Sequence, residues 1–404
     1  MQTEGKRCFG IGKESVSMNE FTYYIPTKIM FGPGTLSALS TVRLPGRNAL
    51  IVITAGKSVR ANGYLERVQN LLAANGCRHV VYDRILPNPI HAHVMEGAAL
   101  ARQHECDFVI GLGGGSPIDS AKAIAVMATN PGDYWDYVAG GTGKGQPLER
   151  APLPVVAITT TAGTGTEADP WTVITHEERQ EKIGFGNENT FPVLSIVDPE
   201  LMLTVPPLLT AYQGFDAFFH AAEGYLANIA TPISDAFALQ SLRLLAKSLS
   251  TAVADGQNLA ARTDVALANT LSGMVESTSC CTSEHSLAHS LSACHPEMAH
   301  GAALLAISEA YFNFFADKVP ERFCAMAQAL GRDGREPQEF IAAMTQMQSQ
   351  CGVRGIRLSD FGVTRAELPA LVENAFATMG GLFVLDRYTL SRDDALGILT
   401  AAYR

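Results

Sequence analysis

The stretch DFVIGLGGGSPIDSAKAIA (107–125) decides the fold class, because it joins a buried strand to a helix through a short run of glycines. The earlier run ALIVIT (49–54) is apolar without alternation, as is typical of a strand that is covered on both faces, and DFVIGLGG (107–114) is a further predicted strand. The glycines let the backbone come close to a ligand, and the free N–H groups at the start of the helix favour an anion. A glycine-rich tight turn before a capped helix would give the same pattern. The candidate residues for phosphate binding are Gly113, Gly114, Gly115, Ser116 and Asp119.

Similar units surround this stretch in the first half of the chain. Short apolar runs alternate with segments whose apolar residues recur at helical spacing, which predicts a parallel sheet of Rossmann-like type. The expected strands are 49–54, 79–85, 107–114 and 154–160, and the expected helices are 62–76, 91–105 and one that begins near Ser116.

The strand pattern stops in the second half of the chain. Ala- and Leu-rich segments such as 235–253 and 368–379 have helical spacing instead. We therefore expect a flexible N-terminal arm (1–20), a dinucleotide-binding α/β domain (21–205) and an all-helical domain (206–404).

Composition and charge exclude several classes of protein. The 404 residues, 47% of them hydrophobic and 17% charged, are too many for one core and too apolar for a disordered chain. The net charge of −10 and the lack of a basic cluster exclude a nucleic-acid partner, and no apolar run is long enough for a membrane span. The eight cysteines are scattered and the N-terminus lacks a signal-peptide pattern, so we expect free thiols and a cytoplasmic protein.

A second loop with ligand-binding character is the threonine stretch, ITTTAGTGTE (158–167). Five of its ten residues are threonine, and Gly163 and Gly165 make it flexible. Because it follows a predicted parallel strand, its hydroxyl groups would lie at the carboxyl edge of the sheet, where such sheets bind ligands. A plain loop rich in Ser, Thr and Gly is the alternative.

Candidate metal ligands lie in two helical segments of the second half. Asp216 and His220 are four residues apart in an apolar segment, and His285 and His289 are also four apart, so each pair shares one helix face. A carboxylate in apolar surroundings is costly unless it is paired or binds a cation. Carboxylate and imidazole groups together suit a borderline divalent ion such as Zn²⁺ or Fe²⁺. Unrelated capping and core histidines are the alternative.

Together these segments resemble the iron-containing (group III) alcohol dehydrogenases, over nearly the whole chain from about Phe21. The resemblance implies an N-terminal Rossmann-like α/β domain with a parallel sheet and an all-helical C-terminal domain, as in dehydroquinate synthase. The motifs that carry it are FGPGTL (31–36), PNP (87–89), GGGSPIDSAKA (113–123), TTAGTGTE (160–167), VDP (197–199) and GFDAFFHAAE (214–223).

The resemblance also implies a metal site made of one carboxylate and three histidines. On this chain these ligands would be Asp216, His220, His285 and His300. His285 and His300 are fifteen residues apart, one more than is usual in the family, so His295 is an alternative ligand, although the glycine after His300 favours His300. The family places a further active-site residue at His289.

For the cofactor, the resemblance implies a nicotinamide dinucleotide whose pyrophosphate lies at the glycine turn (113–116). The segment ITAGKSVR (53–60) lacks the acid that would repel a 2′-phosphate, and its Lys57 and Arg60 would accept one, so we expect NAD(P) with a slight lean to NADP. Two solvated surface cations are the alternative. Further cofactor residues are Gly56, Ser58, Asn88, Thr160, Thr161 and Lys182.

The expected activity is reversible hydride transfer between a small primary alcohol and the nicotinamide, with the metal as a Lewis acid that also polarises the aldehyde. His289 would relay a proton or position the nicotinamide ribose, and Trp171 and Phe219 would be walls of the pocket. Two alternatives stay open: a lyase or synthase like dehydroquinate synthase, and a metal-free relative that only binds nucleotide. The extended segment 23–32 would pair across a homodimer or a higher oligomer, as in the family.

Overall fold

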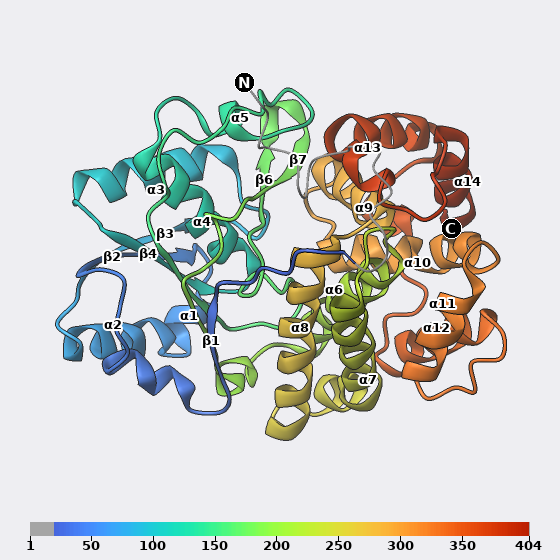
Figure 1. Ribbon diagram of the computed structural model, residues 1–404, viewed down its shortest axis with the longest axis horizontal. Coiled ribbons are helices and arrows are strands. Elements are labelled where there is room, and N and C mark those ends of the chain that lie inside the picture. The colour runs from blue at the N-terminus through green and yellow to red at the C-terminus, as the bar shows by residue number, and fades with distance from the viewer. Residues whose placement is uncertain (1–19, 404) are drawn as a thin grey trace.

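The computed structural model describes residues 20–403, which form two lobes that lie side by side (Figure 1). An α/β half, at the left of the view, precedes a helical half, at the right. The expected N-terminal arm (1–20) lies outside the described residues except for Glu20.

The α/β half is built on a six-stranded sheet in which every neighbouring pair of strands is parallel. Four of its strands, β2 to β5, are the ones expected from the apolar runs, and the parallel Rossmann-like sheet is confirmed. In spatial order the strands are β1 (Lys28–Phe31), β8 (Leu194–Val197), β5 (Val155–Thr159), β4 (Phe108–Gly113), β2 (Asn48–Thr54) and β3 (Arg78–Ile85).

Helices cover both faces of this sheet. They are α1 (Ser58–Ala61), α2 (Tyr64–Ala74), α3 (His91–Gln103), α4 (Gly115–Thr129) and α5 (Tyr134–Tyr137), with short 3₁₀ helices η1 (Thr35–Ser40), η2 (Glu177–Arg179) and η3 (Pro199–Met202). In β2, Leu50 and Val52 pack with α3 and α4, whereas Ala49, Ile51 and Ile53 pack with α2 on the opposite face. The strand is therefore apolar at every position from Ala49 to Ile53, because neither face meets water there.

The helical half contains, among the described residues, helices and loops but no strand, as the sequence predicts. None of the helices within residues 20–403 combines the length and the apolar character that a membrane span requires. The helices are α6 (Pro207–Leu226), α7 (Pro232–Ala254), α8 (Leu259–Ser279), α9 (Ser283–Cys294), α10 (His300–Ala316), α11 (Pro320–Ala329), α12 (Gln338–Gln350), α13 (Leu368–Phe383) and α14 (Arg392–Ala402), with η4 (Leu358–Phe361) and η5 (Arg365–Glu367).

An antiparallel hairpin, β6 (Thr172–His176) and β7 (Glu181–Phe185), is absent from the sequence-based prediction. Its strands have five residues each, and the highly charged turn between them includes Gln180 in a left-handed conformation (φ 52°). So short and polar a segment gives no clear strand pattern. The hairpin lies between the two halves: β6 packs on α4, and β7 contacts α9 and α13.

One buried cation ties this region together. Lys122 on α4 is fully buried, and its Nζ lies 2.7 Å from Thr166 Oγ1 and 3.0 Å from Asp169 Oδ1. The backbone carbonyls of Asp169 and Trp171 lie 2.9 and 2.7 Å from the same atom. The ammonium group therefore fixes the segment that connects the threonine stretch to β6.

We expect Lys122→Met to lower the free energy of unfolding by about 3–5 kcal/mol, because it leaves the buried Asp169 carboxylate without its cation. Urea denaturation followed by circular dichroism measures this loss. Lys144→Met is the matched control: Lys144 pairs with Asp136 but its side chain is 64% exposed, so its loss should cost less than about 1 kcal/mol. Equal losses for the two variants would contradict this account of Lys122.

Candidate metal and cofactor site

A cavity of about 970 Å³ lies between the α/β half and the helical half. Its wall combines residues from the glycine turn and the β6–β7 hairpin with residues from α6, α8, α9, α10 and α13. The cavity is therefore the place where both predicted binding functions meet. Among the residues that line it are Asn88, Ser116, Lys182, Asp216, His285 and His300.

Four of the predicted ligands converge on one point of this cavity. Asp216 and His220 lie one turn apart on α6, His285 lies on α9, and His300 is the first residue of α10. The Oδ1 atom of Asp216 lies 3.9 Å from Nε2 of His220, 3.7 Å from that of His285 and 3.6 Å from that of His300. Two atoms that each bind one ion at about 2.1 Å cannot be more than about 4.2 Å apart, and the three distances from Asp216 meet this limit. The candidate ligand atoms of Asp216, His285 and His300 all lie within 4.8 Å of one another, and so do those of His220, Cys281 and His285.

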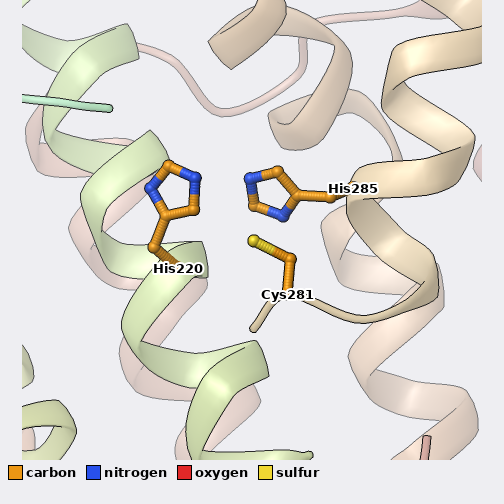
Figure 2. A group of neighbouring side chains, drawn as sticks. All are labelled: His220, Cys281 and His285. Carbon is orange, nitrogen blue, oxygen red and sulfur yellow. The ribbon is translucent and has the colours of Figure 1, made fainter. Parts of the chain in front are cut away.

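The imidazole rings are oriented by hydrogen bonds from their other nitrogen atoms. His220 Nδ1 lies 3.2 Å from the carbonyl oxygen of Gly163, and His285 Nδ1 bonds the Glu223 carboxylate. Both contacts assign the proton to Nδ1 and leave the Nε2 lone pair free to bind a metal. Figure 2 shows ring nitrogen atoms of His220 and His285 facing each other across a gap.

Burial shapes the protonation of this cluster. It lowers the pKa of His220 to about 4 and the pKa of His300 well below its ordinary value, so both rings stay neutral at pH 7. Asp216 Oδ1 and His285 Nε2 are buried and lack a hydrogen-bond partner. An unpartnered carboxylate oxygen among free imidazole nitrogens fits a divalent cation.

The two remaining histidines of this region, His289 and His295, differ in whether they line the cavity. His289 lies in the cavity wall with its ring centroid 5.0 Å from that of His300. His295, the alternative ligand, points instead toward Glu367, with Nε2 3.4 Å from its carboxylate, and it does not line the cavity. The structure therefore does not support His295 as a ligand.

Two further polar groups beside His220 escaped the sequence analysis. Cys281 forms a compact group with His220 and His285, with candidate ligand atoms within 4.8 Å of one another (Figure 2). Glu276 on α8 places Oε2 3.7 Å from His220 Nε2. The only feature of the sequence that could have revealed Cys281 and Glu276 is their position shortly before His285. Neither residue belongs to a recognisable spacing of metal ligands. Of the two expected aromatic walls, Trp171 lines the cavity, whereas Phe219 is fully buried in the helical core, so that prediction was wrong.

The candidate cofactor segments meet at the carboxyl edge of the sheet. Gly56 follows β2, the glycine turn follows β4, and the threonine stretch ends β5 and continues beyond it. In the sheet β4 lies between β2 and β5, and the chain leaves β2 toward one edge and β4 toward the other. Such a change of direction opens the crevice where doubly wound sheets bind dinucleotides.

The glycine turn is tightly packed against the threonine stretch. A Cβ on Gly114 would lie 2.8 Å from Thr161 Oγ1, and one on Gly115 would lie 2.5 Å from Thr164 Cγ2. Part of the requirement for glycine therefore comes from this contact. The Thr160 N–H donates to the carbonyl of Gly113 over 2.8 Å, which joins the two loops.

Two predicted cofactor residues are already engaged within the protein. The Asp119 carboxylate accepts hydrogen bonds from Thr166 Oγ1 (2.6 Å) and the Val173 N–H (3.0 Å), and burial raises its pKa to about 6. The Ser116 hydroxyl donates to the carbonyl of Pro87. Both side chains brace the turn, and their contact with a cofactor stays a prediction.

Lys182 and Asn88 bridge the two halves of the cavity. Lys182 on β7 is buried, which lowers its pKa to about 8, and its Nζ lies 3.3 Å from Asn88 Oδ1. Asn88 in turn donates from Nδ2 to the carbonyl of Pro296, 3.0 Å away in the helical half. A cation at this place is suited to an anionic part of a cofactor.

A smaller pocket of about 410 Å³ lies beyond the end of β2, and Gly56, Lys57 and Arg60 line it. Asp83 from β3 lines it too and pairs with Arg60 at 2.6 Å. The sequence argument for a 2′-phosphate considered the segment 53–60 alone, which contains no acidic residue. It therefore missed Asp83, which lies elsewhere in the chain.

Two family models match this chain over most of its length. Iron-containing alcohol dehydrogenase matches residues 26–199, and the C-terminal model of the same family matches residues 210–403. The chain is 35% identical to 1,3-propanediol dehydrogenase of Klebsiella pneumoniae over 370 residues, which cover 89% of this chain and 93% of that protein. The chain is therefore an oxidoreductase. It belongs to the iron-containing alcohol dehydrogenase family.

Solved structures show the same fold. An archaeal halo-thermophilic alcohol dehydrogenase from a Red Sea brine pool superimposes with a TM-score of 0.90 at 32% identity, covering 95% of this chain and 99% of that one. The NADH-dependent butanol dehydrogenase A of Thermotoga maritima gives a TM-score of 0.85 at 28% identity, covering 96% and 99%. An α/β domain followed by a helical domain is thus confirmed.

We expect Glu223→Gln to weaken divalent-metal binding about 10- to 100-fold, because the neutral amide holds the His285 ring less firmly and no longer increases its basicity. Chelator competition on metal-free protein measures the dissociation constant. The control is Glu188→Gln, an exposed glutamate that does not line the cavity. An unchanged metal affinity in a folded Glu223→Gln protein would contradict the orienting role of Glu223.

Proposed function

We propose that this chain is a divalent-metal-dependent, NAD(P)-linked alcohol dehydrogenase and aldehyde reductase for small primary alcohols. The observation that carries the proposal is the convergence of three Nε2 atoms within 3.6–3.9 Å of one Asp216 oxygen. The proposed ligands are Asp216, His220, His285 and His300, and the proposed ion is Fe²⁺ or Zn²⁺. Names of relatives such as 1,3-propanediol, methanol and long-chain primary alcohol dehydrogenase support this substrate class.

When bound, the ion would supply Lewis acidity for the alcohol oxygen, and the nicotinamide would supply the hydride acceptor. The chain contributes one carboxylate and three imidazoles that would hold the ion, and a cavity lined by both halves, which would limit the access of water. His289, on the cavity wall beside His300, is placed to relay a proton or to position the nicotinamide ribose. Lys182 supplies a positive charge for the cofactor.

The charges of the cavity disfavour the lyase or synthase alternative. A dehydroquinate synthase-like enzyme needs cations to hold an acidic sugar. Of the described residues that line the cavity, Lys182 and Arg387 are cationic, whereas five are acidic. The metal-free alternative leaves the buried Asp216 carboxylate without a partner for its Oδ1 atom.

The cysteines bear on the cellular location of the protein, and one edge of the sheet bears on its oligomeric state. The cysteines among the described residues are free thiols, which supports a cytoplasmic location. β1 is an edge strand of the sheet, and Phe21, Tyr23 and Tyr24 in the segment that precedes it are exposed. These features support a homodimer or higher oligomer built on this edge.

We expect His220→Ala to lose most of its bound metal and at least about 100-fold in kcat/KM for alcohol oxidation, since a Lewis acid contributes several kcal/mol to such a step. Metal content and NAD(P)-linked oxidation of 1-propanol measure both effects. His104→Ala, at an exposed position in the α/β half, is the control. Full turnover of the wild-type chain after complete chelation would refute the metal mechanism.

For the cofactor, we propose that the Arg60–Asp83 pair sets the choice between NAD and NADP. The slight lean to NADP stays a prediction, and the acid beside Arg60 acts against it. We expect Asp83→Asn to raise the NADP-over-NAD ratio of kcat/KM about tenfold, because Arg60 is then free to bind a 2′-phosphate, and Arg60→Ala to lower it. Arg67→Ala, exposed on α2, is the control. The same ratio in all three variants would contradict the proposal.

A further inference from the structure

A second carboxylate lies beside the proposed metal ligands. Glu276 on α8 lines the main cavity, and its side chain is 14% exposed. Its Oε2 atom is buried, has no hydrogen-bond partner and lies 3.7 Å from the Nε2 atom of His220. This is the nitrogen that the Gly163 contact leaves free to bind a metal.

The protein does not provide Glu276 with a permanent cation. Among the ion pairs of the described residues, Glu276 takes part only in the contact with His220. The nearby buried Lys122 is committed to Asp169, and Lys182 lies against Asn88. A buried carboxylate oxygen without a partner is costly, so the placement of Oε2 favours a positive charge that arrives with a ligand.

The charges around the site favour a divalent cation as that ligand. Asp216 lies among the three imidazoles, and the Glu223 carboxylate lies against Nδ1 of His285. Glu276 adds a carboxylate on the His220 side, so negative groups surround the place where an ion would bind. Of the three proposed histidine ligands, only His220 has its nitrogen within ion-pair distance of Glu276, so this carboxylate stands outside the set of four.

Resting on the proposed function, we propose that Glu276 is a second carboxylate of the metal centre, which acts from beside His220 and strengthens the binding of the divalent ion. It is a positioning residue, and the four proposed ligands remain the groups that contact the ion. The attraction between opposite charges a few ångströms apart in a buried site is large, because little water screens it.

Cys281 is the competing candidate for this role, since its sulfur also lies close to His220 and His285. In Figure 2 the sulfur lies near the lower edge of the His285 ring, below the gap across which the two ring nitrogen atoms face each other. A thiolate there would favour softer ions. Cys281→Ser is therefore the matched comparison for the Glu276 variants, because it changes another potential donor in the same wall of the cavity.

The test measures divalent-ion affinity rather than turnover. Metal-free wild-type protein, Glu276→Gln, Glu276→Asp and Cys281→Ser are titrated with Zn²⁺ and Fe²⁺ against a chelator. We expect Glu276→Gln to bind about 10- to 100-fold more weakly, as is usual for the loss of a partner outside the ligand set, and Glu276→Asp to keep part of the affinity. The metal affinity of Cys281→Ser should stay within about threefold of that of the wild type. The near-ultraviolet spectrum of the wild-type protein loaded with Co²⁺ should lack a thiolate charge-transfer band.

Thermal unfolding of the metal-free variants shows whether each is folded before its affinity is compared. A folded Glu276→Gln protein with wild-type affinity would overturn the role of Glu276 while leaving the proposed function intact. A larger loss in Cys281→Ser, with a charge-transfer band in the wild type, would assign the role to the thiol instead. A wild-type chain that binds neither ion would refute the proposed function itself.

Discussion

The carboxylate of Asp216 is the constraint on which the arrangement of the helical half depends. A buried carboxylate costs several kcal/mol unless positive charge or hydrogen bonds compensate it, and Oδ1 of Asp216 has no hydrogen-bond partner. Three imidazole nitrogens surround this oxygen at 3.6–3.9 Å, beyond hydrogen-bond distance. A cation shared by the proposed ligands on α6, α9 and α10 would compensate this carboxylate, and the aromatic core around Phe219 and Phe312 holds α6 against α10.

The local pattern of the sequence predicted what depends on neighbours along the chain. The parallel strands follow from apolar runs, and the pair Asp216 and His220 follows from spacing on one helix face. The convergence of α6 with α9 and α10 depends on tertiary packing. The spacing made His285 and His289 candidates, but the choice of His285 as a ligand and the assignment of His300 came from the family motif. The structure brings all four together.

The residues that the sequence did not reveal have a common property: their partners lie far away in the chain. Asp83 meets Arg60 because β2 and β3 are neighbours in the sheet. Glu276 reaches His220 because α8 packs on α6. Lys122 looks like an ordinary helix lysine, and only the fold shows that it is fully buried against Asp169. No local pattern contains this information, because each contact arises from the packing of separate elements.

The threonine stretch contacts both the proposed cofactor turn in one half and the proposed metal site in the other. On one side its hydroxyl-bearing residues pack on the glycine turn so closely that a Cβ at Gly114 would clash. On the other side its Gly163 carbonyl contacts His220 Nδ1, and Gly165 touches the backbone of α8 at Gly273, where neither residue has room for a side chain. One short loop thus contacts both the cofactor turn and a proposed metal ligand. Because hydride transfer requires the reacting atoms to be held within about 3–3.5 Å of each other, this loop is the element that joins the fold to the chemistry.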